Sequence, residues 1–396
     1  MKIFRFFIPF ALFLTAVIGC QAQNRGPASA ENPILTGADQ PELYLPMLKG
    51  KKVGLVVNHT AITGAGLLPD FLIEEGIDVQ KIFAPEHGFR GEAAAGEIIK
   101  DGKDPKTGIR VFSLYGDVKK PTREHLSGLD ILVFDMQDVG CRFYTYLSTL
   151  YYCIEACAEF NVPLIVLYRP NPNGDYIAGP VRKHDFISFV GIVPVPIVHG
   201  CTLGELALMI NGEGWPGLKA RIDVVKVKNY SHADRYELPV RPSPNLPNYT
   251  AVRLYPSLCF FEATSVSIGR GTDFPFQVIG GTHSHLGDFT FTPVNMPGVA
   301  VDPINMNQKC YGVDLRDLDP VPQFTLKYFL DFYNEYPNEK DFLTRERWLN
   351  LLAGTNTLIE DIRAGKSEQE IVASWEQEIS AYKSIRKKYL LYPDFE

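Results

Sequence analysis

Short apolar runs alternate with amphipathic segments between residues 52 and 227, and this alternation constrains the possible folds more than any other feature. Uninterrupted apolar runs of this kind are typical of strands that are buried on both faces of a sheet. The expected strands span residues 53–57, 79–83, 111–114, 131–134, 164–167, 192–198 and 222–227. The expected helices between them span residues 67–75, 143–160 and 203–210. Strands and helices in alternation predict an α/β fold in which helices cover both faces of a parallel sheet.

The alternation stops at a proline-rich stretch, residues 239–248, and the chain beyond it follows a different pattern. Strands are expected there over residues 274–279, 289–293 and 311–315, and helices over 326–333, 345–352 and 368–389. Such a mixture predicts a smaller α+β domain. We therefore expect a main domain over residues 41–253, an auxiliary domain over residues 254–396, and a ligand cleft between the two.

Polar side chains follow five of the expected strands at the point where each strand ends. In open α/β sheets the carboxyl ends of the strands lie along one edge, and ligands bind there. We therefore expect these side chains to converge on one site. In chain order they are Asn58 and His59; Glu86, His87, Arg90 and Glu92; Asp135 and Asp138; Arg169 and Asn171; and His199.

The densest group of titratable residues is the stretch Pro85-Glu86-His87-Gly88-Phe89-Arg90-Gly91-Glu92. Its glycines allow a ligand to approach the backbone closely. Glycoside hydrolysis needs a carboxylic acid to protonate the leaving oxygen, and often a second carboxylate as base or nucleophile. Glu86, Glu92, Asp135 and Asp138 are the candidates for these roles. The pattern favours carboxylate chemistry, although each acid taken alone also fits a loop cap or a surface charge.

Other chemistries lack their sequence signals. The first expected strand is not followed by Gly-x-Gly-x-x-Gly, and neither a Walker phosphate loop nor a Gly-x-Ser-x-Gly elbow occurs. His59, His87 and His199 all follow expected strands, but no His-x-x-x-His or Cys-x-x-Cys spacing supports a metal ion there. The formal net charge of -7 argues against nucleic acid as a partner. We expect no cofactor, no metal and no nucleic-acid partner.

The first 20 residues have the layout of a secretory signal. Lys2 and Arg5 precede an apolar stretch, and Val17-Ile18-Gly19-Cys20 resembles a bacterial lipobox. This predicts cleavage before Cys20 and lipidation of its thiol; an ordinary signal peptide or a short anchor helix is the alternative. Residues 21–40 are expected to form a flexible tether. The mature chain is then expected in the periplasm or cell envelope, with the lipid anchor as its contact with the membrane.

Seven motifs of the sequence belong together. They are Asn58-His59-Thr60, the stretch from Pro85 to Glu92, residues 135–146, Arg169-Pro170-Asn171-Pro172, Pro242-Ser243-Pro244-Asn245, Tyr255-Pro256 and Gly269-Arg270-Gly271-Thr272. Together they resemble the NamZ family of exo-β-N-acetylmuramidases, and the similarity extends from about Lys51 to the C-terminus. The resemblance implies a Rossmann-like N-terminal domain, a smaller C-terminal domain and an active-site cleft between them. It also implies release of N-acetylmuramic acid from the non-reducing ends of peptidoglycan fragments, with Glu92 at the position of the proposed catalytic glutamate.

Roles for the residues follow as hypotheses. Glu92 is expected to be the general acid, with His87, Asp135 or Asp138 activating water or polarising the substrate. The 2-acetamido group of the sugar is an alternative nucleophile. A bidentate arginine suits the lactyl carboxylate that distinguishes muramic acid from glucosamine. The expected substrate contacts are Asn58, His59, Arg90, Arg142, Tyr144, Arg169, Asn171, His199, Asn245 and Arg270.

Structural roles compete with several of these assignments, and other functions compete with the glycosidase. Arg90 or Arg142 also fits the role of holding Glu86 or Asp138 in place, and Tyr144 also fits core packing. Asn171 and Asn245 stand beside prolines, where asparagine often forms turns. The competing functions are a metal-dependent cell-wall hydrolase and a non-catalytic, lipid-anchored protein that binds glycans.

Overall fold

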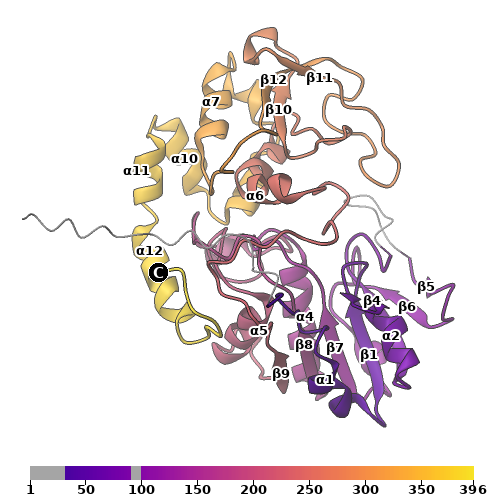
Figure 1. The fold of residues 1–396 in the computed structure, drawn as a ribbon. Coiled ribbons are helices and arrows are strands. Elements are labelled where there is room, and N and C mark those ends of the chain that lie inside the picture. Colours follow the sequence, from indigo (N-terminus) through magenta and orange to yellow (C-terminus); the bar gives the residue numbers. More distant parts are fainter. Residues whose placement is uncertain (1–31, 91–99) are drawn as a thin grey trace, which may run out of the picture.

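The computed structural model describes residues 32–90 and 100–396, which form two domains stacked end to end (Figure 1). The first domain contains a seven-stranded sheet in the order β5-β6-β4-β1-β7-β8-β9. Neighbouring strands run parallel, except for β5 and β6 at one edge. This confirms the predicted α/β fold. The strands are β1 Lys52–Val57, β4 Asp78–Ala84, β5 Gly102–Lys103, β6 Arg110–Ser113, β7 Ile131–Asp135, β8 Leu164–Leu167 and β9 Ile222–Val225.

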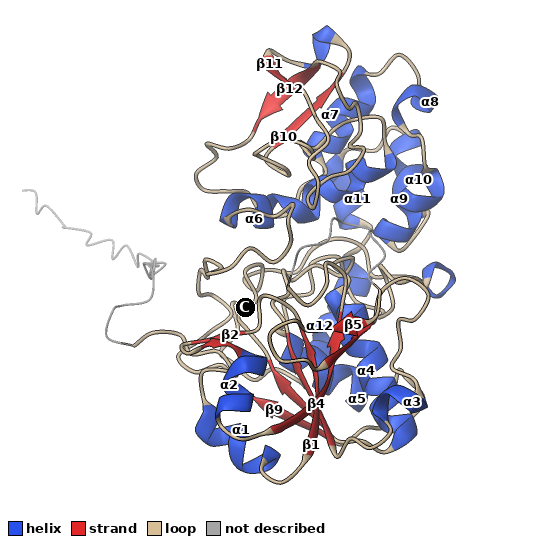
Figure 2. Cartoon of the chain, turned by 90° about the vertical axis from the view of Figure 1, so that its right-hand side faces the viewer, coloured by secondary structure: helices blue, strands red, loops and turns tan. Residues whose placement is uncertain are grey.

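The inner strands are apolar throughout because helices cover both faces of the sheet. On β7, Ile131 and Val133 belong to one core cluster, whereas Leu132 and Phe134 belong to another, as the alternation of side chains along a strand requires. Helices α1 and α2 cover the first cluster, and α3, α4 and α5 cover the second, on the opposite side of the sheet (Figure 2). These helices are α1 Pro41–Leu48, α2 Leu68–Glu74, α3 Arg123–Leu126, α4 Tyr146–Phe160 and α5 Leu203–Gly212.

The predicted strand over residues 192–198 is wrong. The segment is buried and apolar, but it forms only isolated bridges, such as those from Val198 to Cys141 and Ala178. Pro194 and Pro196 explain the difference, because proline has no N–H group to donate to a neighbouring strand. Residues 192–198 are therefore buried without being paired to the sheet.

The described part of the expected tether over residues 21–40 is ordered. Leu35 and Lys228 form a pair of backbone hydrogen bonds of 3.1 and 2.8 Å, and Gly37 N–H donates to the carbonyl of Tyr168 at 3.0 Å. The Gln40 amide donates to the carbonyl of Lys226 at 2.7 Å. These bonds attach the segment to the end of the sheet that carries β8 and β9.

The second domain combines a small antiparallel sheet, in the order β10-β12-β11, with a group of helices. The predicted helix over residues 368–389 is interrupted at Ser374 and Trp375. No helix in the described ranges is both long and apolar enough to cross a membrane. The elements are β10 Val278–Gly281, β11 Phe289–Phe291, β12 Cys310–Asp314, α6 Tyr249–Leu258, α7 Lys327–Glu335, α8 Glu339–Phe342, α9 Glu346–Ala353, α10 Thr357–Arg363, α11 Glu368–Ala373 and α12 Glu376–Arg386. The remaining short elements are β2 Ile62–Thr63, β3 Gly66–Leu67 and the 3₁₀ helices His184–Phe186, Cys259–Ala263 and Ser284–Leu286.

The last element, α12, leaves the second domain and packs against the first (Figure 1). The Tyr382 hydroxyl donates to the carbonyl of His199 at 2.6 Å. The Arg386 guanidinium donates to the carbonyl of Gly200 at 2.7 and 3.0 Å and pairs with Asp394. The chain therefore crosses between the domains twice, once near residue 250 and again before α12.

Candidate active site

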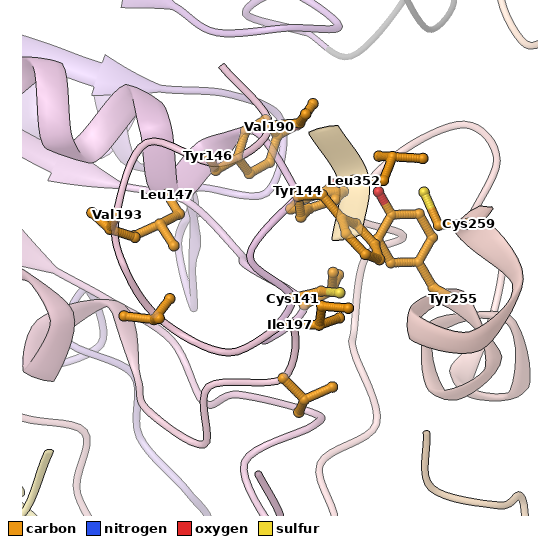
Figure 3. Close-up of a cluster of buried hydrophobic side chains, with 14 of the residues drawn as sticks. Cys141, Tyr144, Tyr146, Leu147, Val190, Val193, Ile197, Tyr255, Cys259 and Leu352 are labelled. Carbon is orange, nitrogen blue, oxygen red and sulfur yellow. The ribbon is translucent and has the colours of Figure 1, made fainter. Parts of the chain in front are cut away.

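A cavity of about 520 Å³ lies where the two domains meet. Its first-domain wall comes from the end of β4, the start of α4 and the loop at residues 188–190. Its second-domain wall comes from α6, the loop at residues 299–304 and α9. Tyr144, Tyr255, Cys259 and Leu352 are drawn together at this junction in Figure 3. The cavity is therefore complete only when both domains are in place.

Glu86 and His87 line this cavity directly after β4. The Thr145 hydroxyl donates to Glu86 Oε2 at 2.7 Å. The Tyr115 hydroxyl also forms a hydrogen bond to Glu86, and burial together with the Glu86 carboxylate raises the pKa of Tyr115. His87 has a φ of +71° and is followed by Gly88 at +77°. A left-handed backbone costs about 1–3 kcal/mol in a non-glycine residue, and such strain occurs mainly at functional sites. The turn presents Glu86 and His87 side by side at the cavity wall.

Three more predicted contacts line the cavity, namely Tyr144, Asn245 and Arg270. The Tyr144 hydroxyl donates to the carbonyl of Pro242 at 2.9 Å, and its ring meets Tyr255 edge-on. Arg270 is paired with Glu262 at 2.5 Å. The Asn245 amide donates to Val299 at 2.8 Å, while its Oδ1 has no hydrogen-bond partner among the described residues.

Asn58 and His59 lie behind the cavity wall and support it. The Asn58 amide donates to the Tyr146 hydroxyl at 2.8 Å, and that hydroxyl lies 3.3 Å from the carbonyl of Pro242. His59 Nε2 lies 2.9 Å from the carbonyl of Arg241, and burial lowers the pKa of its ring. Both residues therefore hold the proline-rich crossing in place rather than line the cavity.

Asp135 and Arg169 form a buried ion pair outside the cavity, with distances of 2.7 and 3.1 Å. Asp135 is fully buried and Arg169 is 4% exposed. Burial raises the pKa of Asp135 to about 6, against the opposing effect of Arg169. The predicted catalytic role of Asp135 and the predicted substrate contact of Arg169 do not fit this geometry, because each group satisfies the other.

Asp138, Asn171 and His199 are also buried outside the cavity. Asp138 Oδ2 accepts from Gly140 N–H at 2.6 Å and lies 3.8 Å from His199 Nε2. Burial raises the pKa of Asp138 to about 7 and lowers that of His199 to about 3. The Asn171 amide donates to the carbonyl of Cys201 at 2.9 Å. All three pack among the strand ends and do not line the cavity, so their predicted catalytic and substrate-binding roles stay predictions.

Neither arginine expected at the lactyl carboxylate is available for it. Arg90 donates from Nε and Nη2 to Asp104 at 3.1 and 2.5 Å. Arg142 is fully buried and donates to the carbonyls of residues 180, 195, 352 and 353 at 2.7–2.8 Å. A guanidinium whose donors are used in this way is structural. Both guanidinium groups therefore have protein partners in this structure, and their roles as substrate contacts stay predictions.

The cavity also includes side chains that sequence reasoning missed. Tyr115, Ser188, Arg345 and Trp348 all line it. Tyr115 stands two residues after β6, as Glu86 does after β4, so the strand-end rule could have found it. The other three do not follow a strand of the parallel sheet. No local motif signals them, because they reach the cavity through the packing of loops and of the second domain. Glu92, the expected general acid, and Cys20 lie outside the described residues. Within the described ranges no group of three His, Cys, Asp or Glu side chains is placed to hold a metal ion.

Comparison with known proteins relates both domains to one family. The models described as exo-β-N-acetylmuramidase NamZ, N-terminal and C-terminal, match residues 53–250 and 253–392. The peptidoglycan β-N-acetylmuramidase NamZ of Bacillus subtilis (strain 168) is 36% identical over 414 residues, covering 98% of this chain and 99% of that protein.

Two crystal structures of DUF1343 family proteins from Bacteroides fragilis NCTC 9343 are also similar. One is 42% identical with a TM-score of 0.84, and the other is 28% identical with a TM-score of 0.79. Each comparison covers 91% of this chain and 99% of the other. The similarity therefore includes both domains and the cavity between them.

Proposed function

This chain belongs to the exo-β-N-acetylmuramidase NamZ family, and from that membership we propose how its cavity acts on peptidoglycan. The chain is a glycoside hydrolase that removes N-acetylmuramic acid from the ends of peptidoglycan-derived glycans. In the proposal, the terminal sugar occupies the cavity between the domains. The observation that carries this is the position of Glu86 and His87, which the strained turn after β4 places in the wall of that cavity.

Two glutamates, six positions apart in the sequence, divide the chemistry in this proposal. Glu92, six positions after Glu86, donates its proton to the glycosidic oxygen as that bond breaks. The Glu86 carboxylate, oriented by Thr145 and Tyr115, stabilises the positive charge that develops at the anomeric carbon. Water or the 2-acetamido oxygen of the substrate attacks that carbon. The aromatic rings of Tyr144 and Tyr255 form an apolar wall that suits a sugar face.

A chromogenic β-N-acetylmuraminide tests this proposal beside the matching glucosaminide. The chain without its first 20 residues is expected to release the chromophore from the muraminide, and to do so equally in the presence of EDTA. Glu92→Gln and Glu86→Gln should each lower kcat by roughly 100- to 10,000-fold, the range typical of lost proton transfer or charge stabilisation.

Glu124→Gln is the matched control, because Glu124 is an exposed residue of α3 away from the cavity. Full activity in Glu92→Gln would refute its role as the acid, and full activity in Glu86→Gln would refute the charge-stabilising role. Activity abolished by EDTA would refute the metal-independent mechanism.

Export and lipid anchoring at Cys20 complete the proposal, supported by the lipobox-like sequence before that residue. When the full chain is expressed in a bacterium, it is expected in the detergent-soluble membrane fraction. Cys20→Ala should prevent lipidation and move the protein out of that fraction. An unchanged distribution in Cys20→Ala would show that anchoring does not use this thiol.

A further inference from the structure

Two arginines of the second domain line the cavity, and they differ in how their charge is balanced. The Arg270 guanidinium is 2.5 Å from the carboxylate of Glu262 and lies over the ring of Phe276. Arg345 donates to the backbone carbonyl of Glu262 and enters no ion pair with any described residue. Its side chain is exposed. Arg345 is therefore the arginine in the described cavity wall whose charge is open to a ligand.

Hydrogen-bond donors without acceptors line the same cavity as this charge. Arg345 is the N-cap residue of α9, and the backbone N–H of Trp348, in the first turn, donates to its carbonyl at 2.9 Å. Trp348 Nε1 and Ser188 Oγ are buried, line the cavity and have no hydrogen-bond partner among the described residues. Buried donors are rarely left unpaired, so they indicate a missing acceptor. The positive end of the α9 dipole adds to the same preference for an anion.

We propose, on the basis of the function proposed above, that Arg345 and Trp348 bind the lactyl carboxylate of the terminal N-acetylmuramic acid. This carboxylate is the group that distinguishes muramic acid from glucosamine. A guanidinium forms two parallel hydrogen bonds to a carboxylate, and the Trp348 indole N–H supplies a further donor. Arg90 and Arg142 are committed to other partners. Arg345 thus sets the preference of the enzyme for muramic acid substrates that carry a free acid.

The test compares a chromogenic muraminide with its lactyl methyl ester, which keeps the shape of the group and removes its charge. Wild-type enzyme should prefer the free acid. Arg345→Gln should lower kcat/KM for the free acid by about 10- to 100-fold, as expected for lost hydrogen bonds to a charged group, and leave the ester nearly unchanged. Trp348→Phe, which keeps the ring and removes the donor, should lower only the free-acid value, by a smaller factor.

Arg347→Gln is the matched control, because Arg347 is an exposed residue of the same helix that does not line the cavity. Arg345→Lys keeps the positive charge but cannot form two parallel hydrogen bonds to a carboxylate. Its kcat/KM for the free acid should therefore lie between the values for wild type and Arg345→Gln. Calorimetric titration with free N-acetylmuramic acid and N-acetylglucosamine gives a second readout, in which Arg345→Gln should lose the difference between the two sugars.

Three outcomes would overturn the inference: equal losses on acid and ester, no loss on either, or wild-type enzyme that does not distinguish acid from ester. Failure of the proposed function has a different signature, since the wild-type enzyme would then release chromophore from neither substrate.

Discussion

The polar residues at the strand ends of this protein divide by whether they border the cavity. Glu86 and His87 stand in the cavity wall, whereas Asp135 and Arg169 satisfy each other in the interior. All four residues stand at the end of a strand of the same sheet or within three residues after it. What separates them is position, because His87 and Arg169 are similarly buried, at 5% and 4% exposure. Asp135 and Arg169 lie away from the cavity and pair with each other, since a charge removed from water must be neutralised or paired within the protein.

The cost of burying a charged carboxylate can be measured at Asp138, as a dependence of the stability of the protein on pH. Its pKa is raised to about 7 in the folded state by burial, above its ordinary value of 3.8. Between these values the folded protein binds a proton that the unfolded chain releases, so the contribution of Asp138 to stability falls as pH rises from about 4 to 7. Asp138→Asn does not titrate, and it keeps an oxygen for Gly140 N–H. The melting temperature of Asp138→Asn relative to wild type is therefore expected to increase from pH 5 to pH 8.

Thermal melts of both proteins across that range check this expectation. His199 Nε2 lies 3.8 Å from Asp138, so the same pair of melts is repeated with His199→Gln in both proteins to separate its titration. Asp223→Asn, at an exposed position on β9, should show a difference that does not vary in this way. A pH-independent difference for Asp138→Asn would contradict a raised pKa at this carboxyl.

Helices and strands were predictable where a local pattern decides them. The strand expected over residues 164–167 is β8, and the one over residues 131–134 is β7 extended by Asp135. Among the elements that were not, two show the reason. Residues 192–198 carry the apolar pattern of a strand, but their prolines prevent pairing. Helix α6 follows directly on the proline-rich crossing and contains Pro256; it begins where the Asn248 side chain accepts from Ala251 N–H at 3.0 Å. In the sequence, one asparagine that could cap a helix is a weak indication of α6, because the many prolines around it argue against a helix.

The return of α12 to the first domain couples the two halves of the molecule. Arg386, which is 1% exposed, binds the carbonyl of Gly200 and pairs with Asp394. Tyr392 contacts Tyr168 at the end of β8. A single large cluster of buried side chains runs through both domains. Neither half can unfold while the other keeps all of its buried contacts.

The protein is therefore expected to unfold in one calorimetric transition instead of two. Arg386→Met should lower the free energy of unfolding by about 3–5 kcal/mol, since it leaves a buried carbonyl and a carboxylate without their partner. Differential scanning calorimetry measures both effects, with Arg347→Met as the exposed control. Two separate peaks in the wild-type protein would show that the domains unfold independently.

The alternation of strands and helices, and the polar stretch from Pro85 to Glu92, both follow from residues close together in the chain. Apolar periodicity and a proline after a strand act over a few residues, so they can be read without a structure. The identity of the cavity wall depends on contacts between distant segments. Whether an arginine such as Arg142 meets four carbonyls or, like Arg345, faces an open cavity is settled by which loops pack around it. Desolvation and hydrogen-bond pairing are properties of those neighbours, and they arise only when the two domains and the returning C-terminal helix come together.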